Sequence, residues 1–444
     1  MKKVFKKIFR SSKSRPEVPK ISFGRFSDSY KEDEKYDAWD RSLEIYEEGK
    51  YLESFRMFLL YLLDDQQNNV IIDDSEDGKL IFEIFQGSKK IRGYADENKV
   101  KAEAKIATAK ELKIGFLRRL MELNFGLQYS RYAIDDDNNI TMVFDTYMLD
   151  GSPYKLYYAL KELAVNADKQ DDILLNEFKV LRSINTGHLR DIDEHIKIIK
   201  FKFLQNSINS SLEELDTTKL NLDKYPGGVS YFLLDTVYKL DYLVKPEGFI
   251  MDIFESIHRE YFRNDNKSPQ LKNRKIVKQL KKVLARSKQE FFDELYGVKS
   301  TFGITAPTTH DRLVNFINGE IENMDWYEKN KYSRIALAVP GYIVGYCLFN
   351  YALPGPDKAF LHLYYNILEQ PYFNNLGFSY DYVKEGSLNK SGILMEIDRI
   401  VKRFRKEYPK LKANKKNLNF KNKLKFARSF LLMIRDFDLE RKTK

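Results

Sequence analysis

The sequence predicts an α+β N-terminal domain, with an antiparallel sheet and flanking helices, followed by an all-α C-terminal domain. Short apolar runs between residues 70 and 146 are separated by acidic or glycine-containing turns, which is typical of antiparallel hairpins. From Asn185 onward, apolar residues recur at helical spacing. Both chain ends are rich in lysine. The predicted divisions are a basic N-terminal extension and linker at 1–30, the α+β domain at 31–184, the helical domain at 185–408 and a basic C-terminal helix at 409–444.

The α+β domain is expected to begin with an amphipathic helical region at residues 36–63. Asp77-Gly78 supplies a hairpin turn between the first two strands. Residues 100–112 are ambiguous, because their alanine content favours a helix while their alternation allows a strand. A helix is predicted at 115–124. The predicted strands cover residues 70–72, 80–85, 91–94, 127–134 and 140–146.

Two helices are expected to complete this domain. Ser152 and Pro153 mark the start of the first, at 152–166, because serine caps helices and proline suits their first position. Asp171-Asp172 predicts the start of the second, which reaches Ser183. We interpret Gly227-Gly228 as a helix break. In the helical domain and beyond it, helices are predicted at 192–207, 212–220, 230–243, 248–263, 269–296, 309–324, 333–350, 357–369, 391–408 and 420–439.

Residues 335–356 contain no charged side chain and are long enough to cross a bilayer. Three prolines, three glycines and several tyrosines interrupt the segment, which favours a buried helix over a membrane span. We therefore predict a buried core helix here. The only cysteine, Cys347, lies in this segment, so an intramolecular disulfide and a multi-cysteine zinc site are both excluded.

The sequence offers no recognisable reaction centre. The polar run 308–312 (TTHDR) lies at a predicted helix start, where an N-cap at Thr309 explains it more simply than acid–base catalysis. The acidic segments 73–78 and 135–139 lack the closing glutamate of a calcium loop, and we interpret both as turns. Glycine motifs for nucleotide phosphates do not occur. We therefore predict no catalytic residues, no metal site, no cofactor and no enzyme activity.

The positive charge is concentrated at the two ends. The first 20 residues carry a formal charge of +7 and residues 401–444 carry +12, whereas the whole chain carries +10, so the body is negative. Residues 1–10 place apolar and basic side chains on opposite helical faces, a pattern that suits an anionic membrane surface, although a lysine-rich end without a role is the simpler interpretation. The candidate contacts to a membrane or polyanion are Lys2, Lys3, Lys6, Lys7, Arg10, Lys415, Lys416, Lys421, Lys423 and Lys425.

The region of about 36–184 shows a characteristic order of predicted elements and characteristic residues at their ends. Leu120–Asn124 end a helix, an acidic turn at Asp135–Asp137 joins two strands, and Leu160–Ala164 lie in a helix followed by the stretch 166–175. In these features the region resembles the type III secretion chaperone-like fold, which includes YbjN-like proteins. The resemblance implies a domain that binds an extended peptide or a segment of a partner, often as a homodimer, and it brings no catalytic residues. The helical half carries no such resemblance.

A partner-binding surface is then expected on the sheet and its flanking helices. Alternation along the strands places about half of the candidates in the core. Replacing Tyr129 and Tyr132 by alanine is expected to weaken partner capture while barely changing thermal stability. The candidates are Tyr129, Tyr132, Met142, Phe144 and Tyr147.

Protein or peptide binding is the function class that remains. We expect a cytoplasmic chaperone or adaptor, for example of a bacterial secretion or envelope system. One alternative is a scaffold at the inner face of the membrane, held by the basic ends. A second is a nucleic-acid-associated protein that uses the basic residues between 402 and 428. A third is an enzyme in the helical domain, which a deep pocket lined by His310 or other titratable groups would indicate.

Overall fold

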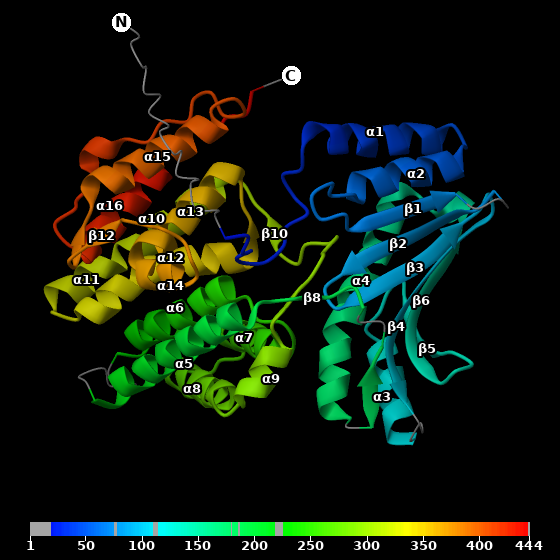
Figure 1. Ribbon diagram of the computed structural model, residues 1–444, viewed down its shortest axis with the longest axis horizontal. Coiled ribbons are helices and arrows are strands. Elements are labelled where there is room, and N and C mark those ends of the chain that lie inside the picture. The colour runs from blue at the N-terminus through cyan, green and yellow to red at the C-terminus, as the bar shows by residue number, and fades with distance from the viewer. Residues whose placement is uncertain are drawn as a thin grey trace, which may run out of the picture.

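The computed structural model of this chain describes residues 19–74, 78–109, 114–178, 180–184, 187–217 and 225–442. It contains two lobes, an α+β domain and a helical domain, which lie side by side in Figure 1. The predicted fold class is therefore confirmed. Residues 1–18, including the predicted basic helix with Lys2, Lys3, Lys6, Lys7 and Arg10, lie outside the described residues.

The α+β domain is built on one antiparallel sheet with the strand order β1-β2-β3-β4-β6-β5. A further strand, β7, pairs with the end of β4. Of the ambiguous stretch 100–112, residues 100–109 belong to the long strand β4, so alternation decided the outcome there over alanine content, and residues 110–112 lie outside the described residues. The strands are β1 (Val70–Asp74), β2 (Leu80–Gln86), β3 (Lys89–Ala95), β4 (Lys99–Ala109), β5 (Arg131–Ile134), β6 (Asn139–Tyr147) and β7 (Leu181–Ser183).

One face of this sheet forms the core and the other carries charges. The core face is covered by α1 (Asp33–Glu47), α2 (Tyr51–Leu62) and α4 (Pro153–Glu177), with α4 packed across β2, β3, β4 and β6. On the opposite face, Glu83 lies between Lys90 and Arg92, and Asp145 pairs with both Lys99 and Arg131. The short helices α3 (Ile114–Asn124) and η1 (Met148–Asp150) complete the domain.

The single helix α4 replaces the two helices predicted at 152–166 and 171–183. Its start is as predicted, since the Ser152 hydroxyl accepts a hydrogen bond from the Lys155 backbone N–H. Asp171-Asp172 does not begin a new helix, because neither glycine nor proline separates the two predicted segments and the helical ladder continues. The last residues of the second predicted helix form strand β7 instead, which pairs with the end of β4.

The helical domain surrounds a second core. The predicted helices at 192–207 and 212–220 are one helix as far as Thr217, and the predicted helix at 269–296 is divided by a capping box at Ser287 and Glu290. The long helices of the helical domain are α5 (Glu194–Thr217), α6 (Pro226–Val244), α7 (Gly248–Phe262), α8 (Pro269–Leu284), α10 (His310–Ile321), α12 (Ser333–Asn350), α13 (Gly355–Leu368), α15 (Lys390–Phe404) and α16 (Lys423–Arg435). Shorter elements are α9 (Lys288–Asp293), α11 (Asn323–Lys329), α14 (Gln370–Asn375), η2 (Lys415–Asn417) and the paired strands β8 (Arg190–Asp191) with β9 (Tyr296–Gly297), β10 (Ala306–Pro307) with β11 (Tyr351–Ala352), and β12 (Val383–Lys384) with β13 (Ser387–Leu388).

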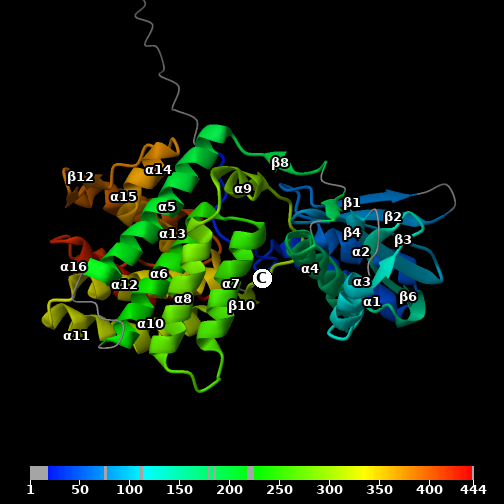
Figure 2. The same ribbon diagram turned by 90° about the horizontal axis from the view of Figure 1, so that it is seen from below.

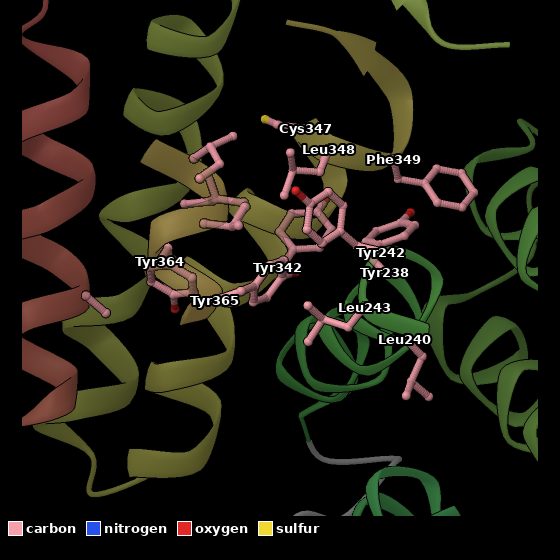
Figure 3. Close-up of a cluster of buried hydrophobic side chains, with 14 of the residues drawn as sticks. Tyr238, Leu240, Tyr242, Leu243, Tyr342, Cys347, Leu348, Phe349, Tyr364 and Tyr365 are labelled. Carbon is pink, nitrogen blue, oxygen red and sulfur yellow. The ribbon is translucent and has the colours of Figure 1, made fainter. Parts of the chain in front are cut away.

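The two most apolar helices, α6 and α12, pack closely at the centre of this core. Tyr238 of α6 lies 4.9 Å, ring to ring, from Phe349 of α12, and Figure 3 shows these side chains converging. A Cβ at Gly345 would lie 2.6 Å from the Cβ of Tyr238, so the helices approach at a glycine. Gly227-Gly228 does not break a helix but lies in the first turn of α6, where a Cβ on Gly228 would collide with Ile335.

The burial of α12 at the centre of the helical domain explains why residues 335–356 carry no charged side chain. From Ile335 onward, most side chains of α12 are buried by neighbouring helices, as the predicted core helix requires. Within the described residues, none of the helices combines the length and the apolar character needed to cross a bilayer. The C-terminal α16 belongs to the same core, since Phe426, Phe430 and Ile434 are fully buried, so residues 409–442 form no separate unit.

Two segments connect the domains, because each is continuous in sequence with one domain and packs on the other. Residues 19–30 (the N-terminal segment), expected to form part of a linker, lie on the helical domain, where Phe23 contacts Phe373 and the Gly24 N–H donates to the Tyr242 carbonyl. Residues 298–305 (the crossing loop) leave the helical domain and enter the α+β domain, whose core contains Phe302. Figure 1 shows both segments between the lobes.

Replacing Ser152 by alanine is expected to lower the free energy of unfolding by about 1 kcal/mol, because the N-terminus of α4 loses its side-chain cap. Thr309 is the matched control. It stands at the N-cap of α10 but makes no side-chain capping bond, so Thr309→Ala is expected to change stability less. Urea denaturation of both variants measures the difference, and equal losses would contradict the role given to the Ser152 hydroxyl.

Candidate binding surfaces

Three of the five sheet residues predicted to contact a partner belong to the core. Tyr132, Met142 and Phe144 are buried beneath the covering helices, because their positions on β5 and β6 point to the helical face of the sheet. Tyr129 is half-buried against the same core, and only Tyr147 is well exposed, at 70%. A Tyr129/Tyr132 double substitution therefore disturbs the core, and its predicted neutrality for stability is wrong.

The acidic turn between β5 and β6 is held by its own side chains. Asp135 accepts hydrogen bonds from the Asn139 backbone and side chain, and it pairs with Lys105 at 2.9 Å. Desolvation raises the pKa of Asp135, but the bonds from Asn139 and Lys105 outweigh it and bring the pKa to about 2. Among the described residues, no group of three or more His, Cys, Asp or Glu side chains is arranged to hold a metal ion.

The outer edge of the sheet at β5 is closed by side chains. The Asn124 amide accepts from the Tyr132 N–H at 2.6 Å and donates to the Tyr132 carbonyl at 3.3 Å. Just before β5, the Glu162 carboxylate accepts three backbone N–H bonds, from Gln128, Tyr129 and Ser130. An incoming strand finds the central donor and acceptor of this edge already occupied, so addition of a peptide strand to β5 is disfavoured.

Replacing Glu162 by glutamine is expected to lower the free energy of unfolding at pH 7 by about 2 kcal/mol, because a charged acceptor of three N–H groups is lost. Desolvation raises the pKa of Glu162, but the backbone bonds outweigh it and leave the pKa lowered. A lowered folded-state pKa stabilises above the unfolded value and loses that effect as the pH falls through the folded value. The difference in unfolding free energy between the two proteins should therefore shrink from pH 7 to pH 3, and a difference that is equally large at pH 3 would contradict the assignment.

Helix α3 presents apolar side chains to solvent. Phe116 and Leu120 are buried against the sheet, whereas Ile114 is 86% exposed, Met121 74% and Phe125, one residue beyond the helix, 95%. The exposed three follow a spacing of seven and four residues, which places them on one stripe. The sequence carries a signal for this surface, since α3 has more apolar residues than one buried face requires. We call Ile114, Met121 and Phe125 the α3 surface.

Exposed apolar side chains are concentrated in the α+β domain. Of sixteen large hydrophobic side chains that are exposed among the described residues, eleven belong to this domain. A second group, Tyr147, Leu149, Tyr154 and Tyr158, lies around the start of α4, where Tyr154 contacts Trp39 of α1 at 5.0 Å. The five in the helical domain and crossing loop are Phe262, Leu271, Ile304, Trp326 and Met395.

Two adjoining cavities, of about 330 and 670 Å³, lie between the domains. The wall that they share includes Arg25 of the N-terminal segment, which bonds Asp241 at 2.7 Å and Glu255 at 3.1 Å. Lys169 of α4 reaches Glu255 at 2.8 Å, so the cluster connects the domains where α4 faces α7 in Figure 2. Burial, with smaller contributions from the charges of Asp168 and Asp241, raises the pKa of the adjoining Glu247 to about 7, against the opposing effects of Lys245 and Arg25.

Replacing Arg25 by alanine is expected to lower the free energy of unfolding by about 3 to 5 kcal/mol, because two largely buried carboxylates lose their shared partner. Arg259 is the matched control, since it also pairs with Glu255 but is half exposed, and Arg259→Ala should cost less than about 1 kcal/mol. Thermal denaturation of both variants compares them. Similar losses would show that burial does not govern this cluster.

The polar run at the start of α10 contributes a buried pair. His310 Nδ1 lies 2.9 Å from Asp357, a fully buried carboxylate of α13, and Phe437 stacks on the imidazole. Neither residue lines the two interdomain cavities. The pair therefore links α10 and α13 inside the helical domain.

The basic C-terminal residues are partly engaged within the domain. Lys415 pairs with Asp398 at 2.6 Å and Lys425 with Glu328 at 2.8 Å. Lys416, Lys421 and Lys423 are exposed. Arg428 in the same helix pairs with Asp325, so several cations of this region already have acidic neighbours.

No protein-family model and no curated protein sequence matches this chain. The resemblance to type III secretion chaperone-like proteins stays a prediction, and function must be argued from the geometry.

Proposed function

We propose that this protein is an adaptor that binds a partner protein through the α3 surface of its α+β domain. The observation that carries the proposal is the exposure of Ile114, Met121 and Phe125 on one stripe. Large apolar side chains gathered on one face of a folded domain mark interaction sites, because water disfavours their exposure. The resemblance of residues 36–184 to secretion chaperones favours the same class of function.

The partner element that fits best is an amphipathic helix. Strand addition at the neighbouring β5 edge is disfavoured because Asn124 occupies the Tyr132 backbone groups. A helical stripe, in contrast, complements another helical stripe with apolar residues at similar spacing. Arg118 and Glu122, which pair at 3.3 Å on the exposed side of α3, provide a polar margin.

The first test replaces Met121 and Phe125 together by serine. Partner binding is expected to weaken at least tenfold, whereas the melting temperature should hardly change because both side chains are exposed. The matched control is Trp326→Ser with Met395→Ser, two exposed apolar residues of the helical domain. Partners captured by the wild-type chain are identified by mass spectrometry, and their affinities for the three proteins are then measured.

Site-specific photo-crosslinking locates the contact. A photoreactive amino acid at position 125 should crosslink the captured partner, and one at position 326 should not. Equal binding by the Met121/Phe125 variant and the control would overturn the proposal. Sedimentation velocity adds a further outcome, since a dimer that dissociates only in the Met121/Phe125 variant would identify a second copy of this chain as the occupant instead.

A further inference from the structure

The larger interdomain cavity, of about 670 Å³, collects positive charge from separate parts of the chain. The N-terminal segment, the start of α5, the end of α6 and the first turn of α13 all contribute to its wall. Five cationic side chains line it besides the paired Arg25. They are Lys20, Arg190, Lys200, Lys245 and Lys358.

The acidic side chains of this cavity do not neutralise those cations. Asp191 pairs with Lys197, which lies outside the lining, and the Asp193 carboxylate accepts the His195 backbone N–H. Within the part of the chain that the structure describes, none of the five cations forms an ion pair with a carboxylate. Arg25 in the same wall has two carboxylates, so the imbalance is specific to the other five.

Lys200 lies deepest among these cations. It is only 3% exposed, and its Nζ donates to the Val244 carbonyl at 2.7 Å, which leaves two N–H groups for another acceptor. Desolvation first, and then the charge of Lys245, lower the pKa of Lys200 to about 8, against the weaker opposing effect of Glu247. Lys358 lines the same cavity and is exposed to solvent. Desolvation first, and then the charge of Lys245, lower the pKa of Lys358 as well.

The charge of Lys245 thus opposes the charges of both Lys200 and Lys358 in a concave site. Lys245 is held there by the backbone, since it has a left-handed conformation with φ of 49° at the C-cap of α6. Enclosing like charges without counter-ions destabilises a fold, and an anion in their midst removes the repulsion. The wall also contains apolar side chains, among them Phe26 and Ile192, which suit the organic part of a ligand.

We propose that this cavity binds a phosphate-bearing small molecule, with Lys200, Lys245 and Lys358 donating to its phosphate oxygens and Lys20 and Arg190 supplying further positive charge. Several cations around one site match a group with two or more negative charges better than a single carboxylate, which one or two cations neutralise. Gln67 of the α+β domain and Ser300 of the crossing loop also line the cavity, so the ligand contacts the junction of the two domains.

The test uses the full chain and inorganic pyrophosphate as the probe in isothermal titration calorimetry. We expect saturable binding with one site per chain, and Lys245→Gln with Lys358→Gln should weaken it at least tenfold. Lys402→Gln with Lys406→Gln, two exposed lysines of the C-terminal region with the same change in net charge, should leave the affinity unchanged. Lys358→Arg, which keeps the charge, should retain binding.

A second measurement separates a ligand site from a structural role. Without added anion, the Lys245/Lys358 variant should melt at or above the wild-type temperature, because repulsion is removed. Pyrophosphate should raise the melting temperature of the wild-type chain and not that of the variant. A variant that melts well below the wild type without anion would show that these lysines serve the fold and would overturn the proposal.

Further outcomes also decide against the site as proposed. The proposal fails if pyrophosphate does not saturate, or if both double variants lose affinity equally. Succinate binding as tightly as pyrophosphate would exclude phosphate specificity. Phosphatidylglycerol vesicles that bind the wild type and not the Lys245/Lys358 variant, while pyrophosphate does not compete, would assign the anion to a lipid surface instead.

Discussion

The crossing loop depends on buried hydrogen bonds that fix the two domains to each other. Thr301 and Phe302 both donate backbone N–H groups to the Gln86 side chain, and the Thr301 hydroxyl donates to the Phe85 carbonyl at 2.8 Å. Asn69, fully buried, donates to Thr301 Oγ1 at 2.9 Å. Each of these polar groups would be costly to leave unpaired in the core, so the loop has one favourable position.

That constraint gives the molecule an interface rather than a flexible connection. Phe302 is buried in the α+β core, while the partly buried Phe23 of the N-terminal segment packs against the helical core, so each domain is contacted by a segment whose chain continues into the other. The cavities between the domains exist because these two segments form part of their walls.

The two proposed sites lie in different physical settings. The α3 surface is an apolar stripe without any enclosing wall, which suits a protein partner that supplies the missing burial. The interdomain cavity is concave and cationic, which suits a small anion that enters a site already shaped. The first is far from the crossing loop in sequence, whereas the second depends on it directly, because Ser300 and Val298 belong to its wall.

The sequence by itself determined the fold class, most element positions and the burial of the apolar segment that became α12. Hydrophobic periodicity is a local property, and helical spacing or strand alternation is read directly from neighbouring residues. Tertiary structure decided which side chains of a strand face the core, as Tyr132, Met142 and Phe144 show, because alternation fixes two faces without saying which one is covered. It also decided the packing of Phe23 and Phe302 and the gathering of Lys200, Lys245 and Lys358. Those contacts join residues far apart in the chain, and no local pattern encodes long-range packing and charge balance.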